Sequence, residues 1–141
     1  MASPFAATLI LCDAAIVDAA GKISMLGAGW DMTGSPTAPQ AVAVLIKVPW
    51  DRTNQRFRVR LQLTDPDGKP IELTGPNQQP SAVGTEAEME AGRPPGIPHG
   101  VPIRSALALS IGPLPLPPGR YDWRLTIGEE TVASEGFTVL G

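Results

Sequence analysis

The sequence is poor in the residues that most often carry chemistry. It contains one cysteine, Cys12, and one histidine, His99, among 141 residues. A single cysteine excludes an internal disulfide framework, and two such residues are too few for the usual zinc site. A serine or cysteine nucleophile needs a base, and no Gly-x-Ser-x-Gly motif accompanies the one histidine. We therefore expect a protein that is not an enzyme and that carries no metal and no cofactor.

Positive charge and long apolar runs are also scarce. Lys and Arg number 11 against 14 Asp and Glu, whereas nucleic-acid binders need a basic surplus to neutralise phosphates.

No apolar run reaches the roughly 18 residues of a membrane span. Residues 5–12 are apolar, but no Lys or Arg precedes them and Leu11 replaces the small residue of a lipoprotein signal. A buried strand is therefore favoured there over a signal peptide. We expect no nucleic acid, no membrane, and a cytoplasmic location, or the virion for a phage-borne protein.

Glycine and proline, by contrast, are abundant. The 15 Gly and 16 Pro lie between short apolar stretches, which is typical of turns in a strand-rich fold. Residues 56–64 and 120–127 alternate apolar and polar side chains with period two, which predicts strands with one buried face. Residues 41–48 are almost all apolar, which predicts a strand buried on both faces. Residues 8–14 and 22–30 flank a polar turn and predict a hairpin.

Residues 83–90 allow two interpretations. Small or apolar side chains at odd positions alternate with Glu86, Glu88 and Glu90, which predicts a strand, yet the same segment has good helix propensity. Strand is favoured. With residues 103–111 and a last strand through 137–139, the pattern gives eight or nine short strands. We expect a single domain over residues 1–141 that is all-β, an antiparallel Greek-key β-sandwich of the immunoglobulin-like or C2-like kind.

Two core residues are predicted from the last third of the chain. Tyr121 follows Leu-Pro-Pro-Gly-Arg at the start of an alternating strand, which is where Greek-key sandwiches place a tyrosine corner. Its hydroxyl should bond to the backbone a few residues upstream. Trp123, two positions later, should point into the core.

Interaction surfaces are the remaining candidates for function. The proline-rich segments 91–102 and 112–119 cannot form regular structure, and such loops order at low entropic cost. The candidate interaction residues are Arg93, Ile97, His99, Trp50, Arg56, Arg58 and Arg60. The three arginines of residues 56–60 are expected to share one sheet face with the three glutamates of residues 86–90, on adjacent or next-adjacent strands. If they do not, the arginine row is free to contact another chain.

Several segments carry a family resemblance. They are Leu-Cys-Asp-Ala-Ala at 11–15, Leu-Gly-Ala-Gly-Trp-Asp at 26–31, Val-Pro-Trp at 48–50, Gly-Arg-Pro-Pro-Gly at 92–96, and the segment 112–125 from Gly-Pro-Leu-Pro to Trp-Arg-Leu. Together they resemble a family of short bacterial proteins catalogued only as a domain of unknown function. The resemblance spans most of the chain and implies a single domain, but it implies no activity, ligand or catalytic residue.

Two functional hypotheses follow. The first is a non-catalytic interaction or structural module with a protein partner or a homo-oligomer, for example an accessory or decoration subunit of a larger assembly such as a phage head. The alternative is a β-sandwich that binds a small molecule or carbohydrate through exposed aromatic side chains such as Trp50.

Overall fold

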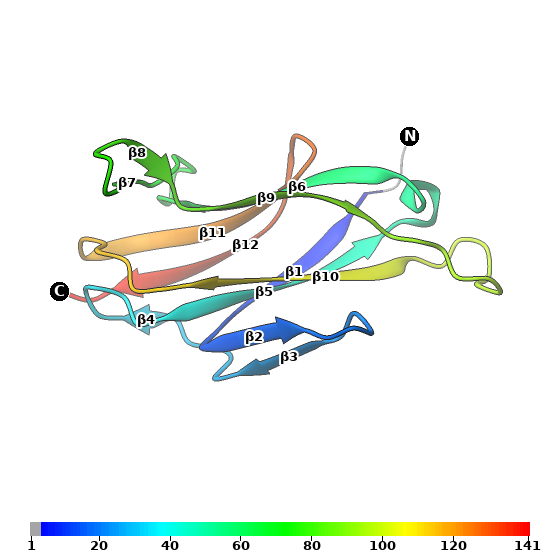
Figure 1. Cartoon of the computed structure of the whole chain (residues 1–141), viewed down its shortest axis with the longest axis horizontal. Helices are drawn as coiled ribbons and strands as arrows, with labels where there is room; N and C mark the ends of the chain where they lie inside the picture. Colours follow the sequence, from blue (N-terminus) through cyan, green and yellow to red (C-terminus); the bar gives the residue numbers. More distant parts are fainter. Residues whose placement is uncertain (1–3) are drawn as a thin grey trace.

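The computed structural model describes residues 4–141, which form two facing β-sheets (Figure 1). The strands of these sheets are β1 (Ala6–Cys12), β4 (Met32–Thr33), β5 (Gln40–Val48), β6 (Arg56–Thr64), β9 (Gly84–Glu90), β10 (Ile103–Ile111), β11 (Gly119–Ile127) and β12 (Glu130–Val139). One sheet has the order β1-β5-β10 and the other the order β4-β12-β11-β6-β9. No helix among the described residues is long and apolar enough to cross a membrane.

The order of strands is that of an immunoglobulin-like sandwich. In immunoglobulin nomenclature β1, β5 and β10 take positions A, B and E, and β12, β11, β6 and β9 take positions G, F, C and C′. All neighbours in the two sheets are antiparallel except β4, which runs parallel to β12. The chain passes from β1 to β4 in the other sheet and back to β5, and it changes sheet again after β5, after β9 and after β10, as in a Greek key. The predicted fold class is confirmed.

Short elements raise the number of strands above the predicted eight or nine. The described residues form twelve strand segments, because β4 and two small hairpins are added to the longer strands. The hairpins are β2 (Ala14–Val17) with β3 (Ile23–Leu26), and β7 (Glu72–Thr74) with β8 (Pro80–Ala82). A turn of 3-10 helix, η1 (Trp50–Arg52), joins β5 to β6. Segments of two to four residues are too short to show an alternating pattern.

The predicted hairpin between residues 8–14 and 22–30 is confirmed in its turn and its second arm but is wrong in its first arm. β2 and β3 pair across the turn at residues 18–22, whereas β1, which contains most of residues 8–14, pairs along its whole length with β5. The chain bends at Asp13, and the β2–β3 hairpin folds back over the outer face of the three-stranded sheet. The small side chains on that face, at Cys12, Ala41, Ala43 and Ala108, let the hairpin approach closely. This covering layer is tertiary, so the local pattern of residues 8–30 did not predict it.

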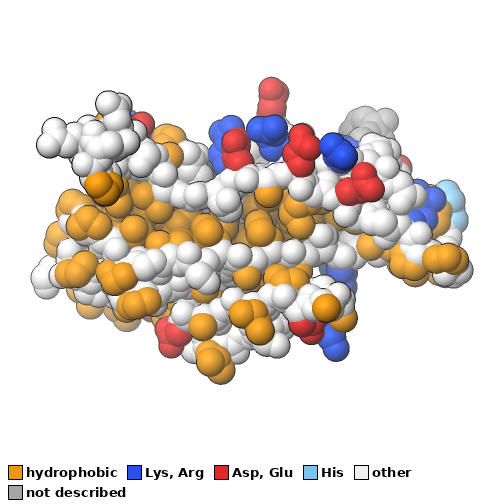
Figure 2. All heavy atoms as spheres, viewed as in Figure 1, with side chains coloured by type: hydrophobic (Ala, Val, Ile, Leu, Met, Phe, Trp, Pro, Cys, Tyr) orange, Lys and Arg blue, Asp and Glu red, His pale blue; other side chains and the backbone are white. Residues whose placement is uncertain are grey.

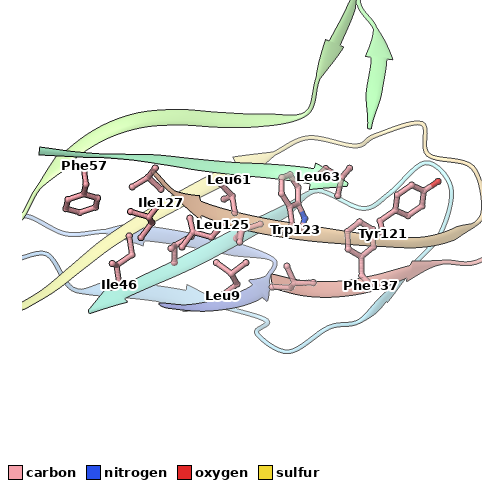
Figure 3. Close-up of a cluster of buried hydrophobic side chains, with 14 of the residues drawn as sticks. Leu9, Ile46, Phe57, Leu61, Leu63, Tyr121, Trp123, Leu125, Ile127 and Phe137 are labelled. Carbon is pink, nitrogen blue, oxygen red and sulfur yellow. The ribbon is translucent and has the colours of Figure 1, made fainter. Parts of the chain in front are cut away.

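The core between the sheets follows the predicted alternation. Figure 3 shows side chains from both sheets meeting there. The inward residues of β6 and β11 are all buried, namely Phe57, Val59, Leu61, Leu63, Tyr121, Trp123, Leu125 and Ile127. Trp123 has no exposed surface, and its indole Nε1–H donates to Oε1 of Gln40 at 3.2 Å. The prediction that Trp123 belongs to the core is confirmed.

The tyrosine corner is present. The Tyr121 hydroxyl donates to the carbonyl oxygen of Pro117 at 2.6 Å, four residues upstream. Burial raises the pKa of the Tyr121 phenol above its usual value of 10.0. The hydrogen bond fixes the proline-rich connector to the start of β11.

The two ends of the described chain lie at opposite ends of the molecule's long axis. The described chain begins near one end, beside η1 and the loop from β9 to β10, and it finishes at the opposite end (Figure 1).

The prediction of a strand rather than a helix over residues 83–90 is confirmed by β9, which pairs with β6 at the margin of the five-stranded sheet.

Candidate functional site

Three of the predicted interaction residues meet at one end of the sandwich. Trp50 lies in η1, and Arg93 and His99 lie in the loop between β9 and β10. Cζ of Arg93 is 3.7 Å from the centroid of a Trp50 ring, and the His99 ring centroid is 4.9 Å from that of Trp50. We call Trp50, Thr53, Asn54, Arg93 and His99 the loop-end cluster. His99, the one histidine, is visible at this end of the molecule in Figure 2.

Local sequence explains how Trp50 is positioned. Pro49 precedes the 3-10 turn with φ −60°, and its carbonyl accepts the N–H of Arg52 at 2.9 Å. Thr53 then closes the turn, because its hydroxyl donates to the carbonyl of Trp50 at 2.7 Å. Asn54 adopts φ 60°, a left-handed conformation that asparagine tolerates better than most residues. The sharp turn that results brings Asn54 to the loop after β9.

Arg93 is held in place by three hydrogen bonds. Its Nε–H donates to the Thr53 hydroxyl at 2.9 Å and its Nη2 to the Trp50 carbonyl at 3.3 Å. Its backbone N–H donates to Oδ1 of Asn54 at 3.0 Å. The guanidinium therefore stacks on Trp50 in a fixed position, where a cation–π contact contributes about 0.5–1 kcal/mol. The cluster is therefore held together by contacts within the chain itself.

A surface hollow of about 450 Å³ adjoins the cluster. Trp50 and His99 line it together with Pro4, Ala6, Lys47, Pro49, Asp51, Gly100 and Pro102. Arg93 does not line the hollow, so Trp50 has the hollow on one side and the guanidinium on another. The lining is mostly apolar and carries both charge signs, which is the composition of a contact surface or a small-ligand site.

The described residues offer no group of three or more His, Cys, Asp or Glu placed to hold a metal ion. Cys12 is fully buried, and its thiol lies 3.5 Å from the carbonyl of Ala41. Burial and then the neighbouring charge of Asp13 raise the pKa of this thiol above 9.0. A protonated, buried thiol of this kind packs as a small apolar side chain.

The three arginines of β6 lie opposite their own glutamates. Arg56, Arg58 and Arg60 are in register with Glu90, Glu88 and Glu86 of the adjacent strand β9, as predicted. Nη2 of Arg60 is 2.8 Å from Glu86, and the other three ion pairs span 3.6–3.7 Å. The side chains are 42–78% exposed, so each pair contributes little to stability. The arginine row is thus neutralised within the chain, and its contact with a partner stays a prediction.

Sequence reasoning found part of the loop-end cluster. It singled out Trp50, Arg93 and His99, and also Ile97, which is half-buried in the same loop but does not line the hollow. It missed Thr53 and Asn54, which fix Arg93. An asparagine between a short turn and a strand is a signal for a left-handed residue, and it could have marked that position.

An immunoglobulin-like β-sandwich with a pre-ordered loop surface at one end is the class of protein that these observations define. A family model matches residues 7–140, and the chain belongs to that family, described as "Family of unknown function (DUF6941)". The predicted resemblance to a domain of unknown function is confirmed. A search of curated proteins found none that matches the chain.

Proposed function

We propose that the chain is a non-catalytic interaction module, acting as an accessory or decoration subunit of a larger protein assembly such as a phage head. The observation that carries this proposal is the fixed stack of Arg93 on Trp50. Tryptophan and arginine are the residues most enriched among binding hot spots. Because three hydrogen bonds already hold Arg93, little conformational entropy is left to lose on association.

Affinity capture from the native host tests the proposal. The wild-type chain should retain a discrete protein partner, and Trp50→Ala should retain at least about ten-fold less of it, as expected for a hot-spot residue. Leu140→Ala is the matched control, since it removes an exposed apolar side chain next to the C-terminal residue, and it should retain the partner. Circular dichroism establishes that each variant is folded. A strict monomer in light scattering with no partner under these conditions refutes the proposal.

A second candidate is the binding of a small molecule or carbohydrate. It is supported by the hollow beside Trp50, whose volume is in the range of small-ligand sites. Against it, Arg93 covers one part of the Trp50 rings, so only the part that faces the hollow is left for a sugar to stack on. A thermal-shift screen separates the two candidates, because a ligand that binds only the folded state stabilises it and raises Tm further as the ligand concentration rises above Kd. That rise should disappear in Trp50→Ala if the hollow is the site.

A further inference from the structure

The two sheets are unequal, and the difference leaves one strand face uncovered. On the closed side of the sandwich β1 approaches β12. The two sheets of a sandwich pack with their strands nearly aligned. The next strands away from this side therefore face each other in turn, β5 opposite β11 and β10 opposite β6. β9 lies one position further out, and none of the described strands lies opposite it. The missing strand is position D, which follows E in the immunoglobulin sheet A-B-E-D.

Burial of the side chains agrees with this vacancy. Thr85, Ala87 and Met89 of β9 share the inward face, because they are in register with the buried Leu61, Val59 and Phe57 of β6. All three are only half-buried. The inward residues of β10 are half-buried too, namely Ile103, Ser105, Leu107, Leu109 and Ile111. Figure 2 shows the resulting band of hydrophobic side chains between β9 and β10.

The free edge of β10 is suited to pairing. β10 has nine residues, pairs only with β5 among the described strands, and contains no proline or glycine. Natural proteins usually protect such an edge with charges, prolines or bulges. Arg104, its one charged residue, lies directly opposite Lys47 of β5, and neither has an ion-pair partner among residues 4–141. Like charges opposite one another are unfavourable, and an acidic side chain beside Arg104 would relieve them.

The position of β9 determines which kind of partner can occupy the empty strand position beside β10. If two copies paired through β10, the β9 of each copy would enter the space that the partner's β6 fills above β10. A single extended segment meets no such obstacle, because only one strand position is empty. We propose that the β10 edge accepts an antiparallel strand from a partner protein, with apolar residues at alternate positions and an acidic residue opposite Arg104. This binding mode is β-strand addition.

The inference rests on the proposed role as an interaction module and assigns it a second, separate surface. The probe is a fluorescein-labelled nine-residue peptide with valine at the inward positions, threonine at the outward ones, and glutamate at the outward position opposite Arg104. Fluorescence anisotropy should show saturable binding to the full chain. Arg104→Glu should weaken binding about three- to ten-fold, and replacing the peptide's glutamate by lysine should restore it to that variant.

Variants of β9 locate the peptide. Ala87→Glu places a charge under the incoming strand and should weaken binding by about ten-fold or more. Glu88→Gln, on the outer face of the same strand, is the matched control and should bind as wild type does. Thermal melts establish that the variants are folded. Equal binding by Ala87→Glu and wild type, or no binding by folded wild type, overturns the inference. A dimer in light scattering that Ala87→Glu dissociates also overturns it, since a second copy would then occupy the edge.

The experiment distinguishes the two proposals. Trp50→Ala changes the loop-end cluster and leaves β10 intact, so it should bind the peptide as wild type does. If the peptide binds but no partner depends on Trp50, the strand site stands and the role of the loop-end cluster fails. If a partner depends on Trp50 but the peptide does not bind, the inference fails and the proposed function stands.

Discussion

Trp123→Ala would remove the largest fully buried side chain of the core. Truncation of a buried aromatic residue costs about 3–5 kcal/mol, through lost transfer free energy and the cavity left behind. The substitution also removes the donor to Oε1 of Gln40, whose Nε2 already lacks a hydrogen-bond partner among residues 4–141. A water molecule entering the emptied site can donate to Gln40 in place of the indole N–H. The lost hydrogen bond therefore adds no separate term to the about 3–5 kcal/mol. The free energy of unfolding of a native domain is about 5–15 kcal/mol, so Trp123→Ala would remove a large part of the stability.

Equilibrium unfolding in urea, followed by far-UV circular dichroism, measures this cost. With a slope of about 1–3 kcal/mol per M, the midpoint should fall by roughly 2 M. Trp50→Ala is the matched control, because it removes the same side chain from the half-exposed loop-end cluster, and it should cost about 1 kcal/mol. A Trp123→Ala midpoint near that of wild type, or equal losses for the two variants, would show that the free energy of core packing has been misassigned.

Three further predictions concern single positions. Tyr121→Phe removes the hydrogen bond to the carbonyl of Pro117 and should cost about 1 kcal/mol, seen as a Tm lower by a few degrees; an unchanged Tm contradicts it. Cys12 has no exposed surface and a raised pKa, so a thiol reagent should react orders of magnitude more slowly with native protein than in urea, and rapid native labelling would disprove its burial. Gly84 has φ +149°, and a Cβ there would strike the carbonyl oxygen of Leu61. Gly84→Ala should therefore cost more than about 2 kcal/mol in urea unfolding, and a wild-type midpoint would refute the assigned conformation.

The strands with one buried face were predictable because burial acts on every second residue. In β6 and β11 the alternate apolar side chains face the core and the charged ones between them are exposed or half-buried, so alternation alone placed both strands to within one residue. The pairing of the arginine and glutamate rows was predictable for a related reason. Three like charges at alternate positions of one strand repel each other, and the opposite row on the adjacent strand offsets this.

Features that depend on distant parts of the chain were not predictable. The β2–β3 hairpin covers the three-stranded sheet because small residues of β5 and β10 leave room for it, and that room appears only after the sheet has formed. The half-burial of β9 likewise depends on how many strands the opposite sheet contains. The loop-end cluster lies between these cases. Its tryptophan and arginine were recognisable by type, but their stacking depends on a turn at Asn54 and a loop about forty residues later.

The opposite placement of the two ends of the described chain determines how the protein should be attached to a solid support. Pro4 and Ala6 line the hollow beside Trp50, whereas the last residues lie at the far end of the long axis (Figure 1). A biotin or affinity tag joined after Gly141 would turn the loop-end cluster away from a sensor surface. A tag joined at the other terminus would instead place linker and matrix beside that cluster. Capture through the C-terminal end therefore leaves Trp50 accessible, and comparing the two orientations tests which end of the molecule a partner approaches.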